Sequence, residues 1–496
     1  MSSSYRQIFK ATSLIGGASL ISGSVHLVQN KVVAVLLGAE GFALLEIYNS
    51  IIALISSIVN FGLGNSGVRQ IAEAAGQDGP GGKTSISAVV TAYRHIIWIT
   101  GALGVVLTVG MAPVLSRWFF KSPEYAWSIA LLSIPLLLGI LCSGQQCVIQ
   151  GLRRIADLSK IRVWAALGGA MGAIPCYFLW GKNGIVIALT VIAGIMLGVT
   201  WLYARRINLE QVRLNAAEHR RILTPMLQLG ICFMSSSVIM AASQFVHKLL
   251  LTRMLGVDAC GLYQAAYALS AFLIGFVLNA MGTDYYPRLV GLVTRPAEMA
   301  RAINEQLEIS LLLAIPALLG MMALAPWLVA VFYSASFTEA ADLIRLFLFG
   351  ILGQVFVWPL GYAVIAHGDG KLFVMLQLIP HSTHVLLLFL GIRYWGVQGA
   401  ALSLFVNYLL SGGMMVGLLR CYYHIRFAWP VPVLTGAALI GLCGTLLLAR
   451  SLTPWTQLWV NCGLAGAGGV LCLYVLIRRL NFSPRRLLEK RMKHGR

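Results

Sequence analysis

Long apolar runs are the feature of this sequence that most limits its fold. A membrane-spanning helix needs about 20 mostly apolar residues, and fourteen runs of the chain meet this requirement. The predicted spans are 12–37, 43–66, 86–114, 126–149, 161–180, 184–204, 223–255, 260–283, 305–332, 341–366, 372–392, 397–419, 431–450 and 456–477. Irregular backbone is not tolerated against lipid, so these runs are predicted to be helices. The sequence therefore predicts an all-α polytopic membrane protein with about 14 transmembrane helices.

The charge composition supports the same conclusion. Only 11% of the residues are charged and 58% are hydrophobic, whereas a soluble domain has about 25% charged residues. The net charge is +20. We exclude a nucleic-acid partner because the basic residues lie in short loops between apolar runs and not along one face.

Basic residues concentrate in alternate loops. If the N-terminus is inside, the inner loops and the C-terminal tail hold most of the 37 Lys and Arg residues. This distribution follows the positive-inside rule and predicts that both termini are cytoplasmic. No cleavable signal peptide is expected, because the first apolar run is too long for a signal-peptide core.

Motifs for catalysis and metal binding are missing from the sequence. The nine cysteines have no CxxC or Cys/His spacing and are interpreted as small core residues. There is no GxxxxGKS/T motif, and the nearest segment, "QDGPGGKT" at 77–84, has Gln in place of the first Gly. We therefore expect no enzymatic activity, no cofactor and no metal. Transport would then depend on a proton or sodium gradient, on consumption of the substrate, or on a partner.

The chain contains an internal repeat, in which the N-terminal pattern recurs 218 residues later. Gly38 then aligns with Gly256, and Glu40 aligns with Asp258. We interpret spans 1–6 and 7–12 as two copies of a six-helix bundle in the same orientation, which places a substrate site at the interface of the copies. The predicted divisions are an N-lobe at 1–220, a C-lobe at 221–425, and an extra helix pair with a basic tail at 426–496.

Polar residues recur every three to four positions on the first two spans of each predicted lobe. This spacing keeps them near one face of a helix. Such stripes either pack helices together or line a watery path, and both interpretations remain open. Spans one and seven contain no Asp or Glu.

The signs of the embedded charges favour an anionic substrate. A site for a cationic drug, Na⁺ or H⁺ normally has a carboxylate at depth, whereas a cationic cavity suits an anion such as a diphosphate. Glu46 is expected to pair with Lys31 or to tune it. The candidate substrate-binding residues are His26, Lys31, Arg69, His247, Lys248, Arg253, Arg288 and Arg345.

Several of these candidates have a structural explanation as well. Lys31 is close enough to the outer end of its span to snorkel to the surface. A neutral, hydrogen-bonded core histidine would account for His26. Arg69 and Arg288 follow spans two and eight at nearly equivalent positions, and topology alone explains both.

Two later spans contain polar residues with competing explanations. Asp342 is the expected structural partner of Arg345. His381 and His384 lie beside Pro380 and are equally well explained as packing residues at a kink.

Three segments of the chain resemble the O-antigen and polysaccharide-unit flippases, the Wzx group. They are Val32–Glu73, Phe337–Leu378 and "GVQGAALSLFVNYLL" at Gly396–Leu410. The resemblance covers roughly residues 10–420. It is specific to a superfamily that also contains multidrug/toxin extruders and lipid II flippases.

This resemblance implies two six-helix lobes around a V-shaped cationic cavity that opens alternately to each side. It implies a flippase of the bacterial inner membrane that moves an undecaprenyl-diphosphate-linked oligosaccharide from the cytoplasmic to the periplasmic leaflet. The headgroup would occupy the cavity and the tail would remain in membrane lipid. Polysaccharide polymerase and chain-length proteins are candidate partners.

Three alternatives remain open. The first is a lipid II flippase, because the extra helix pair is similar to one in the lipid II flippases, where it forms a groove for the lipid tail. A multidrug/toxin cation antiporter would share the fold, although the missing acids in spans one and seven count against it. A membrane scaffold or a polymerase subunit belongs to another class, and a polymerase would be expected to have a large periplasmic loop.

Overall fold

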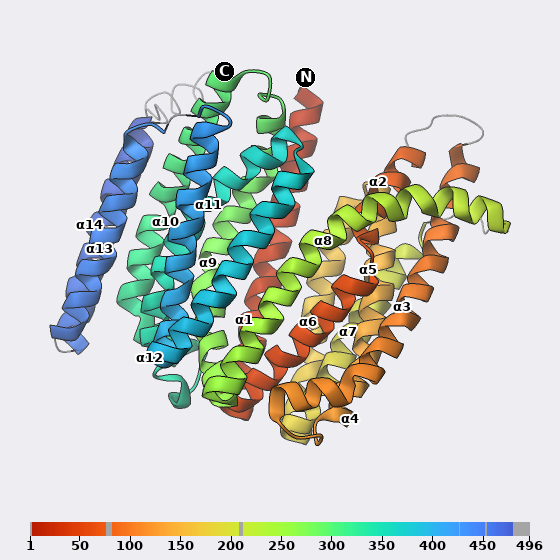
Figure 1. Ribbon diagram of the computed structural model, residues 1–496, viewed down its shortest axis with the longest axis horizontal. Helices are drawn as coiled ribbons and strands as arrows, with labels where there is room; N and C mark the ends of the chain where they lie inside the picture. Colours follow the sequence, from red (N-terminus) through yellow and green to blue (C-terminus); the bar gives the residue numbers. More distant parts are fainter. Residues whose placement is uncertain (1, 76–81, 208–211, 426, 452–453, 480–496) are drawn as a thin grey trace, which may run out of the picture. The chain divides into compact units, whose positions relative to one another are not determined.

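The protein is represented by a computed structural model that describes residues 2–75, 82–207, 212–425, 427–451 and 454–479. The described residues form helices, short turns and connections, and none of them is in a strand. The all-α fold predicted from the apolar runs is therefore confirmed (Figure 1). Most of the loop "QDGPGGKT" and the basic tail beyond 479 lie outside the described residues.

All fourteen predicted spans fall on helices. The α-helices are α1 (Ser2–Val59), α2 (Leu63–Ala75), α3 (Gly82–Phe120), α4 (Ala126–Leu131), α5 (Ser133–Gly151), α6 (Ile155–Trp180), α7 (Gly184–Ala204), α8 (Ala216–Leu255), α9 (Val257–Val290), α10 (Pro296–Phe332), α11 (Ala340–His367), α12 (Gly370–Cys421), α13 (Pro430–Ser451) and α14 (Pro454–Arg479). Short 3₁₀ turns are η1 (Gly181–Asn183) and η2 (Ala335–Phe337). The count of fourteen separate crossings stays a prediction.

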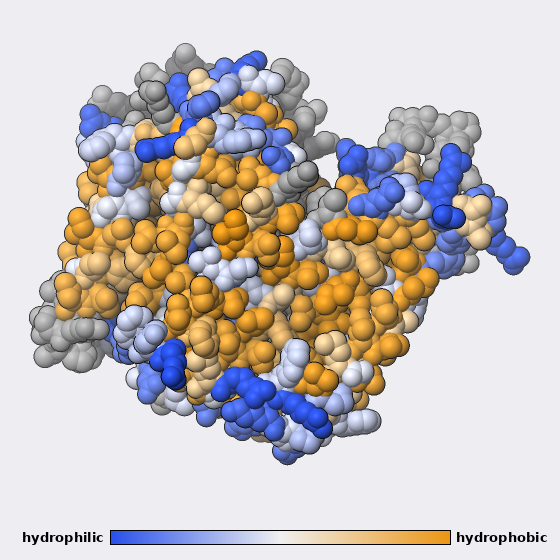
Figure 2. Space-filling model, in the orientation of Figure 1, coloured by the Kyte–Doolittle hydropathy of each residue, from blue (hydrophilic) through white to orange (hydrophobic). Residues whose placement is uncertain are grey.

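Among the described residues, nine helical stretches are long and apolar enough to cross a membrane. Three of these stretches, Gly17–Val59, Ile155–Ala204 and Leu372–Cys421, each cover two predicted spans. Figure 2 shows apolar side chains over most of the visible helix surfaces and hydrophilic ones gathered toward helix ends. Exposed apolar surface of this extent suits lipid and not water, so the protein is a multi-pass membrane protein.

Glycines with positive φ mark sharp turns between helices. Gly38 (φ 67°, ψ −167°) divides α1 into two spans, and Gly396 (φ 58°, ψ −141°) divides α12. Gly256 (φ 93°) separates α8 from α9, and Gly181 (φ 56°) follows α6. Residues with a Cβ rarely adopt this conformation. The aligned pair Gly38 and Gly256 thus shares an unusual backbone geometry, and a similar geometry recurs at Gly181 and Gly396.

The chain divides into two compact units. The first unit comprises 1–265, 332–337 and 370–397, and the second comprises 266–331, 338–369 and 398–496. This division does not follow the predicted lobe boundary at 220/221, because α8 and the first part of α12 belong to the first unit. The two repeat-based lobes stay a prediction.

Small residues allow close helix packing in the first unit. A Cβ on Gly62 would lie 2.0 Å from the carbonyl oxygen of Gly230 in α8, and a Cβ on Gly261 would lie 2.0 Å from that of Ala39. Only glycine permits backbones to approach this closely, as is common between membrane helices. These contacts pack α8 and the start of α9 against α1 and its C-terminal turn.

The second unit has a similar contact between α11 and the last part of α12. Cβ atoms built on Gly350 and Gly353 would lie 2.7 Å from Leu404 and 2.5 Å from Tyr408. Tyr285 in α9 donates a hydrogen bond to the carbonyl oxygen of Pro359 in α11 (3.1 Å). Small residues and tyrosine hydroxyls therefore hold this unit together as well.

Candidate functional site

A buried ion pair joins α8 to α1 in the first unit. Lys248 Nζ lies 2.9 Å from a carboxylate oxygen of Glu46 and 2.8 Å from the Glu46 backbone oxygen. The Lys248 side chain is 8% exposed and that of Glu46 is 28% exposed. Burial of an unpaired ammonium is costly, so the carboxylate and the carbonyl oxygen allow this lysine to be charged inside the bundle. The sequence suggested Lys31 as the partner of Glu46, but Glu46 pairs with Lys248.

Two histidines from separate helices meet beside this ion pair. The rings of His247 in α8 and His384 in α12 pack edge to face, with centroids 4.3 Å apart. The Ser243 hydroxyl lies 3.4 Å from His247 Nε2. His384 is buried, and its Nε2 has no hydrogen-bond partner within the described structure. We call Glu46, Ser243, His247, Lys248 and His384 the polar cluster.

The polar cluster combines an ion pair with two imidazoles. The ion pair is neutral as a whole, and a neutral imidazole has one nitrogen that donates and one that accepts a hydrogen bond. An anion that replaced the Glu46 carboxylate would meet one ammonium and two imidazoles. Within the described part of the chain, no group of three or more His, Cys, Asp or Glu residues could hold a metal ion.

A second polar site lies between α1, α6 and α7. It is a cavity of about 340 Å³ lined by Ser19, His26, Gln29 and Arg162 together with apolar residues. Arg162 Nη1 donates to Ser19 Oγ (2.8 Å), and His26 Nδ1 lies 3.1 Å from Gln29 Oε1. The polar stripe of the first span therefore faces a cavity along at least part of its length.

Arg162 is the residue that sequence reasoning missed. The positive-inside rule accounts for Arg162 as one of the basic residues near an inner loop, but it lies on α6 and also lines a second cavity of about 420 Å³ with Arg153 and Ser159. Its position one residue inside the predicted span 161–180 was the available signal, because an arginine there is costly unless it faces water or a partner.

The remaining candidates of the first unit lie elsewhere. Lys31 is exposed, and it has no ion pair in the described structure. Arg69 pairs with Glu73 on the surface of α2 (2.7 Å). Arg253 donates hydrogen bonds to the carbonyl oxygens of residues 117 and 118, near the C-terminal end of α3. Such a cap satisfies carbonyl groups that the helix leaves free, which gives Arg253 a structural role.

Two candidates belong to the second unit. Arg288 pairs with Glu305 (3.0 Å) on the exposed ends of α9 and α10. Arg345 pairs with Asp342 (2.9 Å), as expected from their spacing on one helix. The Arg345 side chain is 10% exposed, and its Nε has no partner in the described structure.

These helices and their apolar surfaces define a multi-pass membrane protein. The sequence profile of the family described as "Polysaccharide biosynthesis protein" matches residues 8–293, more than half of the chain. The protein belongs to this family.

Known relatives of the chain are flippases and transporters. The lipid III flippase of Escherichia coli (strain K12) is 19% identical over 411 residues, which cover 82% of this chain and 97% of the relative. A putative O-antigen transporter of Shigella flexneri is 21% identical over 382 residues, covering 76% and 88%. These matches confirm the resemblance to the Wzx-like flippases and identify a membrane flippase, not an enzyme.

The fold has counterparts among solved structures. The lipid II flippase MurJ, in an inward closed conformation, superposes with a TM-score of 0.66 at 14% identity. The superposition covers 94% of this chain and 99% of the MurJ chain. The helical architecture of the chain is therefore similar to that of MurJ.

Proposed function

We propose that the protein translocates an undecaprenyl-diphosphate-linked oligosaccharide from the cytoplasmic to the periplasmic leaflet by alternating access, for assembly of O-antigen or a related surface polysaccharide. The observation that carries the proposal is the polar cluster, in a chain of the polysaccharide biosynthesis family. A relative described as a putative O-antigen transporter and another described as a lipid III flippase support this class of substrate.

The polar cluster suggests how a diphosphate is held. Phosphate oxygens bind an ammonium with strong, charge-assisted hydrogen bonds. In this proposal the diphosphate takes the place of the Glu46 carboxylate on Lys248, and His247 and His384 donate further hydrogen bonds. When the headgroup leaves, Glu46 pairs with Lys248 again. Glu46 thus prevents an unpaired buried charge while the site is empty.

The cavity beside Arg162 would take a different part of the headgroup. Its hydroxyl, amide, imidazole and guanidinium groups are the types that hydrogen-bond sugar hydroxyls and phosphates. Ser19, His26, Gln29 and Arg162 then act together with the polar cluster, and Lys31 serves as an exposed cation nearer the outer end of its span.

The remaining parts of the proposal concern location and coupling. We infer a bacterial inner-membrane location with both termini in the cytoplasm, from the distribution of basic residues. A proton or sodium gradient would drive transport, and polysaccharide polymerase or chain-length proteins would receive the product.

A lipid II flippase is the second candidate function. The observation that favours it is the helix pair α13 and α14 together with the nearly complete superposition on MurJ. A multidrug/toxin cation antiporter is less well supported. The Glu46 carboxylate is already neutralised by Lys248, so it offers no free anion to a cationic drug.

Complementation tests the function and the cluster together. The protein is expressed in a Gram-negative strain that lacks its own O-unit flippase, and polymeric lipopolysaccharide is measured on a gel. We expect restoration by the unchanged protein and a loss of at least about tenfold for Lys248→Gln, since a charge-assisted hydrogen bond is removed. Lys182→Gln is the matched control, because Lys182 forms an exposed ion pair with Glu40.

Other outcomes separate the alternatives. Rescue of growth in a strain depleted of its lipid II flippase would favour the second candidate. Resistance to cationic dyes without polymeric lipopolysaccharide would contradict both flippase functions. A triple variant, Lys31→Ala/Lys248→Ala/Arg253→Ala, that exports normally at equal protein levels would contradict the role of the cations.

A further inference from the structure

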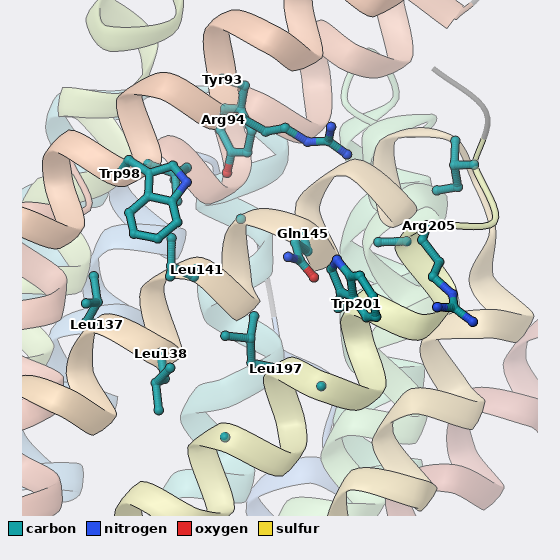
Figure 3. Close-up of a pocket in the computed structure, with 16 residues that line it drawn as sticks. Tyr93, Arg94, Trp98, Leu137, Leu138, Leu141, Gln145, Leu197, Trp201 and Arg205 are labelled. Carbon is teal, nitrogen blue, oxygen red and sulfur yellow. The ribbon is translucent and has the colours of Figure 1, made fainter. Parts of the chain in front are cut away.

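A groove in the first unit, distinct from the polar cluster, has the chemistry of a lipid site. It is lined by α3, α5 and α7 and encloses about 800 Å³ (Figure 3). Ligand sites in proteins typically enclose about 300–1,000 Å³. The polar cluster is built by α1, α8 and α12, none of which lines this groove. We call it the lateral groove.

Two arginines form one end of the lateral groove. Figure 3 shows the guanidinium groups of Arg94 and Arg205 pointing toward the same side of the groove. None of the described lining residues is acidic, and neither arginine has an ion pair in the described structure. Arg205 instead lies over the Trp201 ring, with its Cζ 5.0 Å from the ring centroid. This end therefore carries two positive charges that no carboxylate of the described residues neutralises.

A further polar group lies between the arginines and the apolar part. The Oε1 atom of Gln145 in α5 is buried and has no hydrogen-bond partner in the described structure. An unpaired buried amide group is unfavourable. The amide of Gln145 therefore adds a polar group to the lining between the arginines and the leucines.

The other end of the groove is apolar. Leucines of α5 and α7 line it, among them Leu137, Leu138 and Leu197, and Figure 3 shows the first two on the side away from the guanidinium groups. Gly194 and Gly198 in α7 also line the groove, and a Cβ on either would meet no atom within 4 Å. The glycines therefore leave an open hollow beside the leucines that a hydrocarbon chain would fill.

We propose that the lateral groove binds an anionic glycerophospholipid of the cytoplasmic leaflet. Its headgroup lies at the end of the groove that Arg94 and Arg205 line, and an acyl chain lies along the leucines and the two glycines. The positive-inside distribution assigns the arginine end to the cytoplasmic side, and basic pockets between helices on that side suit anionic lipid headgroups. Trp201, which lies against Arg205, fits the membrane interface, where tryptophan is enriched.

The proposal does not depend on which substrate the protein transports. The bound lipid would keep α3, α5 and α7 together by contributing negative charge beside the arginines and hydrocarbon in the hollow beside the leucines. A membrane phospholipid is the occupant of choice because it is always present beside this groove, whereas the transported headgroup is proposed to bind at the polar cluster.

Native mass spectrometry of the purified full chain tests the proposal. The delipidated protein is titrated with cardiolipin, with phosphatidylcholine and with undecaprenyl diphosphate. We expect a preference for cardiolipin over phosphatidylcholine on the order of tenfold, from two arginines at the headgroup. Arg94→Gln/Arg205→Gln should remove this preference, whereas Arg220→Gln/Arg221→Gln, which changes two exposed arginines outside the groove, should retain it.

A second pair of variants tests the hydrocarbon part. Gly194→Leu/Gly198→Leu, whose Cβ atoms would meet no atom within 4 Å, should fill the hollow and lower cardiolipin binding about tenfold. Gly110→Leu is the matched control, since its Cβ also meets no atom within 4 Å and it does not line the groove. Thermal unfolding of each variant checks that the protein is folded. Quenching of tryptophan fluorescence by brominated lipids provides an independent readout, and we expect it to decrease in Trp98→Phe/Trp201→Phe.

Three results would overturn the proposal. One is equal binding of cardiolipin by the glycine-filled and unchanged proteins, which would indicate unspecific lipid around the helices. Another is a lack of preference for cardiolipin over phosphatidylcholine. The third is one-for-one displacement of cardiolipin by undecaprenyl diphosphate at lower concentration, which would assign the groove to the transported lipid.

Discussion

Lys248 can remain charged inside the first unit because two oxygen atoms of Glu46 accept hydrogen bonds from its ammonium group. Removing one partner of a buried ion pair leaves the other charge without compensation, which costs more than the pair itself contributes. The two residues differ in this respect. Glu46 is partly exposed and can reach polar surroundings, whereas Lys248 is almost fully buried.

We therefore predict that Glu46→Gln destabilises the protein more than Lys248→Met does. The double variant should be more stable than the sum of the single effects implies, with a coupling energy of about 1–3 kcal/mol. Unfolding of the purified protein in detergent, followed by circular dichroism, measures all three variants. Additive effects would mean that the ion pair contributes nothing to the folded state.

The predictability of such contacts depends on sequence separation. Asp342 and Arg345 are three positions apart on one helix, so helix geometry alone identified the pair. Glu46 and Lys248 are 202 positions apart, and their contact depends on how α8 packs on α1. The sequence suggested Lys31 as the partner of Glu46 because it lies nearby in the chain. It also left His384 unconnected to His247, since nothing in either span indicates which faces meet.

At the scale of elements, glycine turns determine where helices change direction. Hydropathy predicted the spans well, because crossing lipid requires about 20 apolar residues. It did not predict that Gly38 and Gly396 bend nearly continuous helices. Both have positive φ with ψ in a range that is open essentially only to glycine. The alignment of Gly38 with Gly256 was visible in the sequence, but the shared backbone conformation was not.

Gly38→Ala should destabilise the protein by about 1–3 kcal/mol, the cost of placing a Cβ in this backbone region. No neighbouring atom lies within 4 Å of the added methyl group, so the backbone is the only source of strain. Gly110→Ala, inside α3 and equally unobstructed, should be neutral or slightly stabilising. Thermal unfolding compares the two. Equal effects would show that Gly38 is not required for its φ.

At the scale of the whole molecule, the distribution of basic residues predicts the orientation of the chain in the membrane. The sequence supports this prediction strongly, because insertion responds to Lys and Arg in short loops. The sequence gives little information about which residues form each compact unit. Residues 370–397 belong to the first unit although they follow 266–331 and 338–369 of the second in the sequence. Such long-range packing depends on complementary surfaces that no local pattern records.

Cysteine labelling checks the predicted orientation. Cys421 at the end of α12 is exposed, whereas Cys142, Cys147 and Cys260 are buried. In a variant that keeps Cys421 as its only thiol, a membrane-impermeant maleimide should label inverted vesicles and not intact spheroplasts. Cys421→Ser in the same background is the control for unspecific reaction. Labelling from the outside would reverse the assigned topology of this end of the chain.

The interleaving of the two compact units has a consequence for how the protein is made. The chain passes between the units five times, and the first unit includes residues as late as 397. Domains usually fold one after another as the ribosome releases them. Here the first unit lacks its last helix until most of the chain has been synthesised. The early helices are therefore inserted in the bilayer but incompletely packed during this interval. Access to insertion chaperones at this stage would determine the yield of folded protein.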